Sequence, residues 1–264
     1  MREVRKAIIP AAGFGTRLAP LTQLMPKEML PLGGKVVLQH VIEECDAAGL
    51  DNLLVVINRR KTALFPVPQE TPREVDPATG VPRRSVYFAN QEQQGGVAHA
   101  LLHGEAFAGD EPFVVALGDA VIHGGDRSLL GRMIAAHREH GAAATVAAQV
   151  VPEDRISLYG VFEPEGDPSD VFRVRRIVEK PARGTAPSNL AVTARYVFLP
   201  EIFRACRECG RDAEGEILLP QAITWLAEQG RTVLGVRLGP DERRLDIGSP
   251  RSYAEAFRLM SEAP

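Results

Sequence analysis

Two glycines and an arginine form the first group of residues that could carry chemistry. Gly13-Phe14-Gly15-Thr16-Arg17 directly follows a short apolar run, Lys6 to Ala11, which is typical of a β-strand. The glycines would let backbone N–H groups approach a polyphosphate closely, and Arg17 adds a forked cation. An isolated Gly-x-Gly turn is more often only a tight turn, and this one lacks the third glycine of a dinucleotide fingerprint and the Gly-Lys-Ser/Thr of a P-loop. Further residues must therefore decide whether it binds phosphate.

Two aspartates and a lysine farther along the chain could add a metal ion and a second cation. Asp119 follows the apolar run Phe113 to Leu117, Asp246 precedes the last predicted helix, and Lys180 stands before Pro181. Taken singly, each also fits a simpler interpretation. The aspartates are common turn residues, and a lysine before a proline is typical of a solvated loop. Both interpretations stay open on these grounds alone.

The order of the motifs resembles one known family. Gly13 to Arg17 is followed within ten residues by Pro26-Lys27-Glu28-Met29-Leu30-Pro31-Leu32. Together the two segments are similar to the nucleotidyltransferase family of nucleoside-diphosphate-sugar pyrophosphorylases, most of all to bacterial UTP:glucose-1-phosphate uridylyltransferases. The similarity extends over nearly the whole chain, through Gln91, Gly96 to Ala100, 117–119, 159–161, 178–181, 186–191, 195–197, 216–217 and 246–250.

The resemblance implies a nucleotide side and a metal site. By this resemblance, the residues that contact the triphosphate and the base would be Ala11, Ala12, Gly13, Gly15, Thr16, Gln91 and Gly96. Arg17 would act on the triphosphate, and Lys27 would neutralise the departing pyrophosphate. Asp119 and Asp246 resemble the two carboxylates that hold one Mg²⁺ in this family. Mg²⁺ is therefore the expected cofactor.

The resemblance also implies a sugar-phosphate side, formed by Gly160, Glu179, Lys180 and Asn189. Lys180 would hold the anionic nucleophile, and Glu179 would accept hydrogen bonds from sugar hydroxyls. A sugar 1-phosphate has a second pKa near 6, so its oxygen is a nucleophile at neutral pH without a general base. Such a site needs cations and alignment, which Arg17, Lys27 and Lys180 would supply as catalytic residues.

The implied activity is Mg²⁺-dependent transfer of a nucleotidyl group from UTP to glucose 1-phosphate, giving UDP-glucose and pyrophosphate. Two alternatives remain. The first keeps the chemistry but uses dTTP, GTP or a modified sugar or cyclitol 1-phosphate, since base identity rests on a few contacts. The second is a non-catalytic regulatory subunit that binds a sugar nucleotide, because resemblance concerns fold as well as chemistry.

The elements that must position these residues alternate between short apolar strands and helices. We predict strands over Lys6 to Ala11, Leu53 to Ile57 and Phe113 to Leu117, and helices over Val36 to Ala48, Val97 to Phe107 and Ser128 to about His140. This alternation predicts an α/β fold with a Rossmann-like, mostly parallel sheet sandwiched by helices. Ligands bind beyond the carboxyl ends of such strands, where Gly13 and Asp119 both lie.

The second half of the chain is richer in predicted strands, which indicates a sugar-binding lobe. The strands are expected at Thr145 to Val150, Gly160 to Phe162, Val171 to Val178 and Leu190 to Phe198, and helices at Ile217 to Glu228 and Pro250 to Met260. We expect a single nucleotidyltransferase domain over 1–264, with a nucleotide-binding half at 1–143 and a sugar-phosphate-binding half at 144–264. The proline-rich segment Lys61 to Arg84 predicts an irregular or mobile loop.

Composition limits the partners. The chain has 264 residues and a formal net charge of -3, so nothing indicates nucleic acid or an anionic membrane as a partner. No stretch approaches the roughly 20 apolar residues of a transmembrane helix. Three cysteines, an odd and sparse set, suit a reducing compartment, and we expect a cytoplasmic protein. The resemblance favours a homo-oligomer, a dimer or tetramer.

Two further spacings suggest metal sites but lack the remaining ligands. Cys206 and Cys209 form a Cys-x-x-Cys pair with no second pair at matching spacing, so we interpret them as structural or incidental. His99 and His103 are four residues apart on a predicted helix, but the glutamate and third ligand of a zinc hydrolase are missing. Helix packing is the better interpretation. The arginines at 173–176 and 243–244 are most simply solvated.

Overall fold

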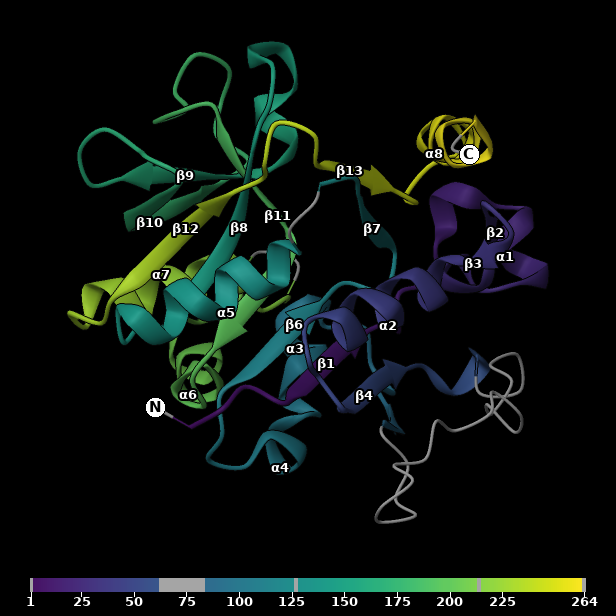
Figure 1. Ribbon diagram of the computed structural model, residues 1–264, viewed down its shortest axis with the longest axis horizontal. Helices are drawn as coiled ribbons and strands as arrows, with labels where there is room; N and C mark the ends of the chain where they lie inside the picture. Colours follow the sequence, from purple (N-terminus) through teal and green to yellow (C-terminus); the bar gives the residue numbers. More distant parts are fainter. Residues whose placement is uncertain (1, 62–83, 126–127, 213–214, 263–264) are drawn as a thin grey trace.

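A nine-stranded sheet runs through both halves of the chain and carries helices on both faces (Figure 1). The computed structural model describes residues 2–61, 84–125, 128–212 and 215–262, so most of the proline-rich segment lies outside the described residues. In spatial order the strands are β5 (Ser85–Asn90), β4 (Asn52–Ile57), β1 (Lys6–Pro10), β6 (Phe113–Ala116), β11 (Leu190–Phe198), β8 (Ala144–Val150), β12 (Val233–Arg237), β10 (Val171–Glu179) and β9 (Gly160–Pro164).

The predicted parallel order holds for the four strands of this sheet that come from residues 6–116. β5, β4, β1 and β6 are all parallel. From β11 onward the sheet is mixed, because β11 runs antiparallel to β6 and β8, and β10 runs antiparallel to β9 and β12. β12 and β8 are again parallel. The α/β sandwich is therefore confirmed, and the β-rich second half departs from parallel order.

Helices cover the sheet according to the alternation of its side chains. In β1, Ala7 and Ile9 face one core with α2 (Val37–Ala47) and α5 (Leu129–Glu139). Ile8 faces the opposite core with α3 (Gly96–Leu102), α6 (Glu201–Glu208) and α7 (Leu219–Glu228). Both cores consist mainly of buried apolar side chains, which is why the central strands read as continuous apolar runs.

One predicted helix is wrong in its length. The segment expected as a single helix from Val97 to Phe107 forms α3, which ends at Leu102, and the separate α4 (Glu105–Ala108). Gly104 lies between them, and a Cβ on Gly104 would stand 2.4 Å from Cδ1 of Ile8. The chain therefore breaks where its backbone packs directly on β1, a contact that helical periodicity does not reveal.

Two small sheets join residues that are far apart in the sequence. β7 (Ala120–His123) pairs antiparallel with β13 (Arg243–Asp246), and β2 (Pro31–Leu32) pairs with β3 (Lys35–Val36). α8 (Pro250–Glu262) packs beside them, and the hydroxyl of Tyr253 donates to the Pro31 carbonyl at 2.8 Å. Figure 1 shows β13 reaching from the second half of the chain to β7 in the first. Within the described ranges, no helix is long and apolar enough to cross a membrane.

Candidate active site

The glycine turn begins where β1 ends, and its neighbours hold it by its carbonyl groups. Asn58 Nδ2 donates to the Ala12 carbonyl at 2.5 Å, and Lys61 Nζ donates to the Ala11 carbonyl at 2.7 Å. Thr22 Oγ1 donates to the Gly15 carbonyl at 2.8 Å, and Gly15 has the left-handed φ of 65°. Within the part of the chain that the structure describes, the N–H groups of residues 13–16 donate no hydrogen bond. They are therefore available to an anion.

A buried ion pair lies beneath this turn. Lys61, in the 3₁₀ turn η3 (Arg59–Lys61), donates to Glu28 Oε2 at 2.7 Å, and both side chains are almost fully buried. Burial raises the pKa of Glu28 and lowers the pKa of Lys61, because desolvation outweighs the attraction between the two charges. Since Glu28 directly follows Lys27, the pair connects the glycine turn to the segment that carries Lys27.

Lys61→Met is expected to lower the free energy of unfolding by about 3–5 kcal/mol, because it leaves the Glu28 carboxylate buried without its partner. Equilibrium urea unfolding measures the change. The double variant Glu28→Met with Lys61→Met should recover much of the loss, because no unpaired charge then remains buried. A double variant that is no more stable than Lys61→Met would contradict this account. Arg59→Met, an exposed change in the same turn, is the matched control.

Lys27 and Asp119 meet at the centre of the site. Lys27 lies in η2 (Lys27–Met29), and its Nζ is 2.5 Å from Asp119 Oδ2. A Cβ on Gly13 would lie 3.7 Å from the same Nζ, so the ammonium group stands between the glycine turn and the carboxylate. Burial opposes both charges, but the Asp119 charge and other carboxylates raise the pKa of Lys27, and Lys27 holds the pKa of Asp119 below its usual value.

The two aspartates expected to hold a metal lie where β7 begins and where β13 ends, Asp119 directly before β7 and Asp246 as the last residue of β13. Ala120 and Asp246 are Cα partners across β7 and β13, and the Ile247 N–H donates to the Asp119 carbonyl at 3.0 Å. Asp119 and Asp246 come from opposite halves of the chain, yet the small sheet brings them together. The predicted juxtaposition of these two carboxylate residues is thus present in the structure.

Arg17 reaches the same group from the glycine turn. Gly248 lies between Arg17 and Asp246, since a Cβ on Gly248 would be 2.7 Å from Asp246 Oδ2 and 3.4 Å from Arg17 Nη2. Arg17 is exposed and makes no ion pair within the described residues. Thr16, its neighbour in the 3₁₀ turn η1 (Thr16–Leu18), is also exposed. The guanidinium is free to pair with a ligand phosphate.

Arg244 corrects one expectation from the sequence. We interpreted the arginines at 243–244 as solvated, and Arg243 is exposed, but the Arg244 side chain is only 16% exposed. Its Nη2 donates to Asp246 Oδ1 at 2.6 Å, and its guanidinium lies over the Tyr159 ring. Arg244 Nε is buried without a partner among the described residues. Pairing with Asp246 and stacking on Tyr159 draw this arginine inward, whereas Arg173, Arg175 and Arg176 are exposed as expected.

The end of β10 pairs with the start of β9, and this junction carries Gly160, Glu179 and Lys180. Glu179 and Gly160 are Cα partners, and a Cβ on Gly160 would be 3.0 Å from Glu179 Oε2. Burial raises the pKa of Glu179 despite the nearby charge of Lys180, whose Nζ is 3.8 Å from Oε1. Lys180 has a φ of 44°, a left-handed conformation that is uncommon outside glycine and recurs at functional sites. Its ammonium group is exposed, so it can also contact an anion while it lies beside Glu179.

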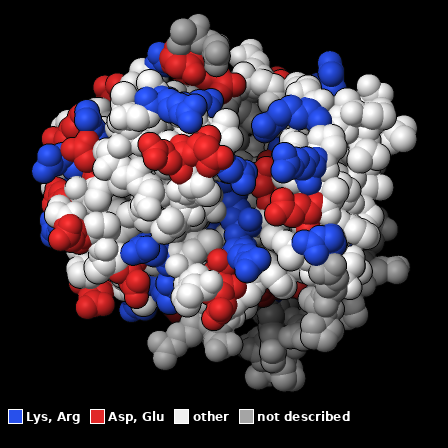
Figure 2. All heavy atoms as spheres, turned by 90° about the horizontal axis from the view of Figure 1, so that it is seen from above, with Lys and Arg blue, Asp and Glu red and all other residues white. Residues whose placement is uncertain are grey.

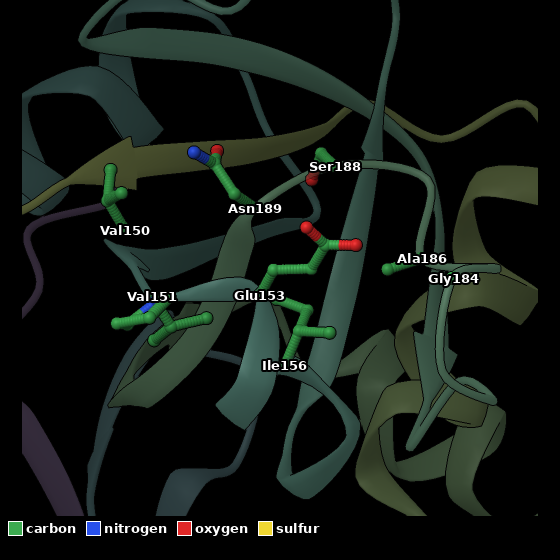
Figure 3. Close-up of a pocket in the computed structure, with 9 residues that line it drawn as sticks. Val150, Val151, Glu153, Ile156, Gly184, Ala186, Ser188 and Asn189 are labelled. Carbon is green, nitrogen blue, oxygen red and sulfur yellow. The ribbon is translucent and has the colours of Figure 1, made fainter.

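Asn189 lies beside a hollow in the second half of the chain. It lines this hollow of about 670 Å³ between the end of β8, the turn η4 (Glu153–Leu158) and the segment before β11. Figure 3 shows Asn189, Ser188 and Glu153 around this hollow. Neither Glu179 nor Lys180 is among its lining residues. The place of Asn189 on the sugar-phosphate side stays a prediction.

Gln91 and Gly96 adjoin each other at the other end of the site. Gln91 directly follows β5 and is 2% exposed, and its Nε2 donates to the Gly96 carbonyl at 3.3 Å. Gly96 has a φ of 80°, and a Cβ there would be 3.2 Å from Glu216 Oε2. Gln94 Nε2 donates to the Ala12 carbonyl at 3.2 Å, which ties this end to the glycine turn.

Sequence reasoning missed the buried groups that hold the site in place. Besides Lys61 and Asn58, these include Arg195, which is fully buried. Its guanidinium donates to both oxygens of Glu44 in α2 and to the Ala120 carbonyl at 2.9 Å. Arg195 therefore fixes the backbone beside Asp119. It belonged to a matching stretch of the sequence, but no local pattern indicated its partners.

The arrangement can bind a polyanion and align it with a second anion. Figure 2 looks onto the molecule from the upper side of Figure 1 and shows lysine and arginine side chains across the middle of this face, with acidic side chains beside them. Lys27 and Arg17 provide cations next to free N–H groups, and Asp119 and Asp246 provide carboxylates beside these cations. Such a set of groups suits phosphoryl-group chemistry, in which positioning and charge neutralisation dominate.

Comparison with known proteins gives a consistent answer. The family model described as nucleotidyl transferase matches residues 6–263. The chain is 39% identical to the UTP–glucose-1-phosphate uridylyltransferase of Bacillus subtilis (strain 168), over 96% of this chain and 89% of that protein. It is 33% identical to the protein of the same name from Mycoplasma pneumoniae, over 97% of this chain and 92% of that one.

Solved structures agree with these relatives. A crystal structure of a UDP-glucose pyrophosphorylase complexed with UDP-glucose superposes with a TM-score of 0.86 and 32% sequence identity, covering 97% of this chain and 98% of that chain. The apo form of a UDP-glucose pyrophosphorylase gives a TM-score of 0.85, again at 32% identity and with the same coverage.

Proposed function

Because the chain belongs to the nucleotidyl transferase family, we propose that it is a Mg²⁺-dependent enzyme that transfers a uridylyl group from UTP to glucose 1-phosphate. The products are UDP-glucose and pyrophosphate. The names of the relatives support this choice of substrates. The observation that carries the proposal is the meeting of Lys27, Asp119 and Asp246 beside the glycine turn.

The nucleotide half binds the triphosphate. The unpaired N–H groups of residues 13–16 donate to phosphate oxygens, and Arg17 and Lys27 neutralise their charge. The bond from the α-phosphorus to the pyrophosphate oxygen breaks during transfer, so the leaving group gains negative charge. Lys27, already held among carboxylates with a raised pKa, stays protonated and stabilises that charge.

The donor set at Asp119 and Asp246 fits Mg²⁺. This ion prefers one or two carboxylates completed by phosphate oxygens and water, rather than a cage made only of protein ligands. Two adjoining aspartates match that preference, and among the described residues no cluster of three or more acidic, histidine or cysteine side chains could hold a metal. When bound, Mg²⁺ supplies charge stabilisation at the reacting phosphates.

The second half binds the sugar phosphate and presents its oxygen. That oxygen attacks the α-phosphorus, and no proton moves, because the phosphate is mainly dianionic at neutral pH. Lys180 pairs with the attacking phosphate, and Glu179 accepts hydrogen bonds from sugar hydroxyls beside the open backbone of Gly160. These groups align two anions that would otherwise repel each other.

Purified protein with Mg²⁺ and glucose 1-phosphate is expected to release pyrophosphate fastest with UTP when UTP, dTTP, CTP, GTP and ATP are compared separately. A coupled phosphate assay measures release, and chromatography identifies the sugar nucleotide. Omission of glucose 1-phosphate is the control, because transfer requires both substrates. Pyrophosphate release that is independent of any sugar phosphate, or silence across a wide panel of sugar phosphates and nucleotides, would contradict the proposal.

A further inference from the structure

The side-chain amide of Gln91 has a fixed orientation. Its Nε2 lies 2.8 Å from His99 Nδ1 and 3.3 Å from the Gly96 carbonyl, so both amide hydrogens have acceptors. Within the described ranges of the chain, Gln91 Oε1 accepts no hydrogen bond. The buried amide therefore has one free function, an oxygen that can only accept.

Two acceptors hold this orientation, His99 Nδ1 at the shorter distance and the Gly96 carbonyl. With the amide in this orientation its nitrogen donates, so His99 Nδ1 accepts and the ring hydrogen lies on Nε2. The ring is held in place from two sides. A Cβ on Gly95 would lie 2.8 Å from His99 Cγ, and the His103 ring packs edge-on at 5.1 Å between centroids. If residue 99 offered a hydrogen-bond donor instead of an acceptor, Gln91 would turn its oxygen toward residue 99 and its N–H groups toward the ligand.

We propose that His99 is a positioning residue that sets base specificity by fixing Gln91 as an acceptor. The inference rests on the proposed function, in which Gln91 contacts the base. Uracil and thymine carry a ring N–H between two carbonyl groups, and this N–H can donate to Gln91 Oε1. Cytosine and adenine present a bare ring nitrogen at the equivalent edge, which would set two lone pairs against each other. His99 therefore favours UTP and dTTP over CTP and ATP.

The test compares His99→Leu with His99→Asn. Leucine removes the acceptor, whereas asparagine Oδ1 stands at the same distance along the side chain as histidine Nδ1 and can accept from Gln91. We expect His99→Leu to lower the ratio of kcat/KM for UTP to that for CTP by about tenfold, the size of one hydrogen bond, with the change mainly in KM for UTP. His99→Asn should retain most of the ratio.

His103→Leu is the matched control, because it removes the neighbouring ring, which makes no hydrogen bond to Gln91 among the described residues. The ratio of kcat/KM for UTP to that for CTP should be the same in His103→Leu as in the unaltered protein. An unchanged ratio in His99→Leu, or equal losses in His99→Leu and His103→Leu, would overturn the proposal. Calorimetric binding of UTP and CTP to the same variants supplies a readout independent of turnover.

Gln91→Leu separates this inference from the proposed function. Loss of the UTP preference in Gln91→Leu but not in His99→Leu would remove only the role of His99. A UTP preference that survives in Gln91→Leu would show that the base is read elsewhere, which overturns the inference but leaves nucleotidylyl transfer intact. Absence of turnover by the unaltered protein with every nucleotide would instead contradict the proposed function.

Discussion

Asp119→Asn and Asp246→Asn are each expected to reduce kcat by ~10²-fold or more, because each removes a carboxylate that suits Mg²⁺ and with it several kcal/mol of transition-state stabilisation. The fold should survive in both. In Asp119→Asn the new amide keeps an oxygen to accept from Lys27, and the pairing of β7 with β13 uses backbone groups only. Steady-state rates at several Mg²⁺ concentrations measure the effect, and each variant should need more Mg²⁺ for its half-maximal rate.

Asp110→Asn is the matched control for charge, since Asp110 is an exposed carboxylate that pairs with Arg2 on the surface. Its rate should stay near that of the unaltered protein. Unchanged turnover and Mg²⁺ dependence in both site variants would contradict the assignment of the metal to this pair. A loss in Asp119→Asn alone would leave Asp246 as a partner of Arg244 rather than a ligand.

The strands and helices that a short stretch of sequence can specify by its apolar pattern were predicted correctly. The apolar runs at β1, β4 and β6 and the helices α2 and α5 appear within a residue or two of their expected bounds. Ser128 caps α5 as expected, with its hydroxyl accepting from the Gly131 N–H. β1 and β6 are parallel neighbours in the sheet, which confirms the prediction that Gly13 and Asp119 lie at one rim.

The parts that could not be predicted depend on contacts between distant segments. β7 and β13 are four-residue strands whose pairing joins residues about 120 positions apart, and short strands have no distinctive periodicity. Arg195 and Glu44 meet across 151 positions, and Lys61 and Glu28 across 33. A charged residue in a sequence gives no sign of its burial, which is why Arg244 was misjudged. The oligomeric state stays a prediction.

Lys27→Met is expected to lower kcat by about 10²–10³-fold, the effect of removing one preorganised group from a developing charge. The loss should exceed that of Lys27→Arg, which keeps the charge but not the geometry. Single-turnover rates at saturating substrates isolate the chemical step, and equilibrium unfolding checks the fold. Equal rates in the unaltered protein and Lys27→Met would show that the leaving group is stabilised by other residues.

Combining Lys27→Met with Asp119→Asn tests whether the two residues act as one unit. Their side chains contact each other directly, and the charge of each shifts the pKa of the other toward its ionised form against the cost of burial. Removing either one therefore already disrupts the environment in which the other works. The double variant should lose much less activity than the product of the two single losses, as residues in one network do. A multiplicative loss would mean that Lys27 and Asp119 contribute separately, and their contact would then have a structural role only.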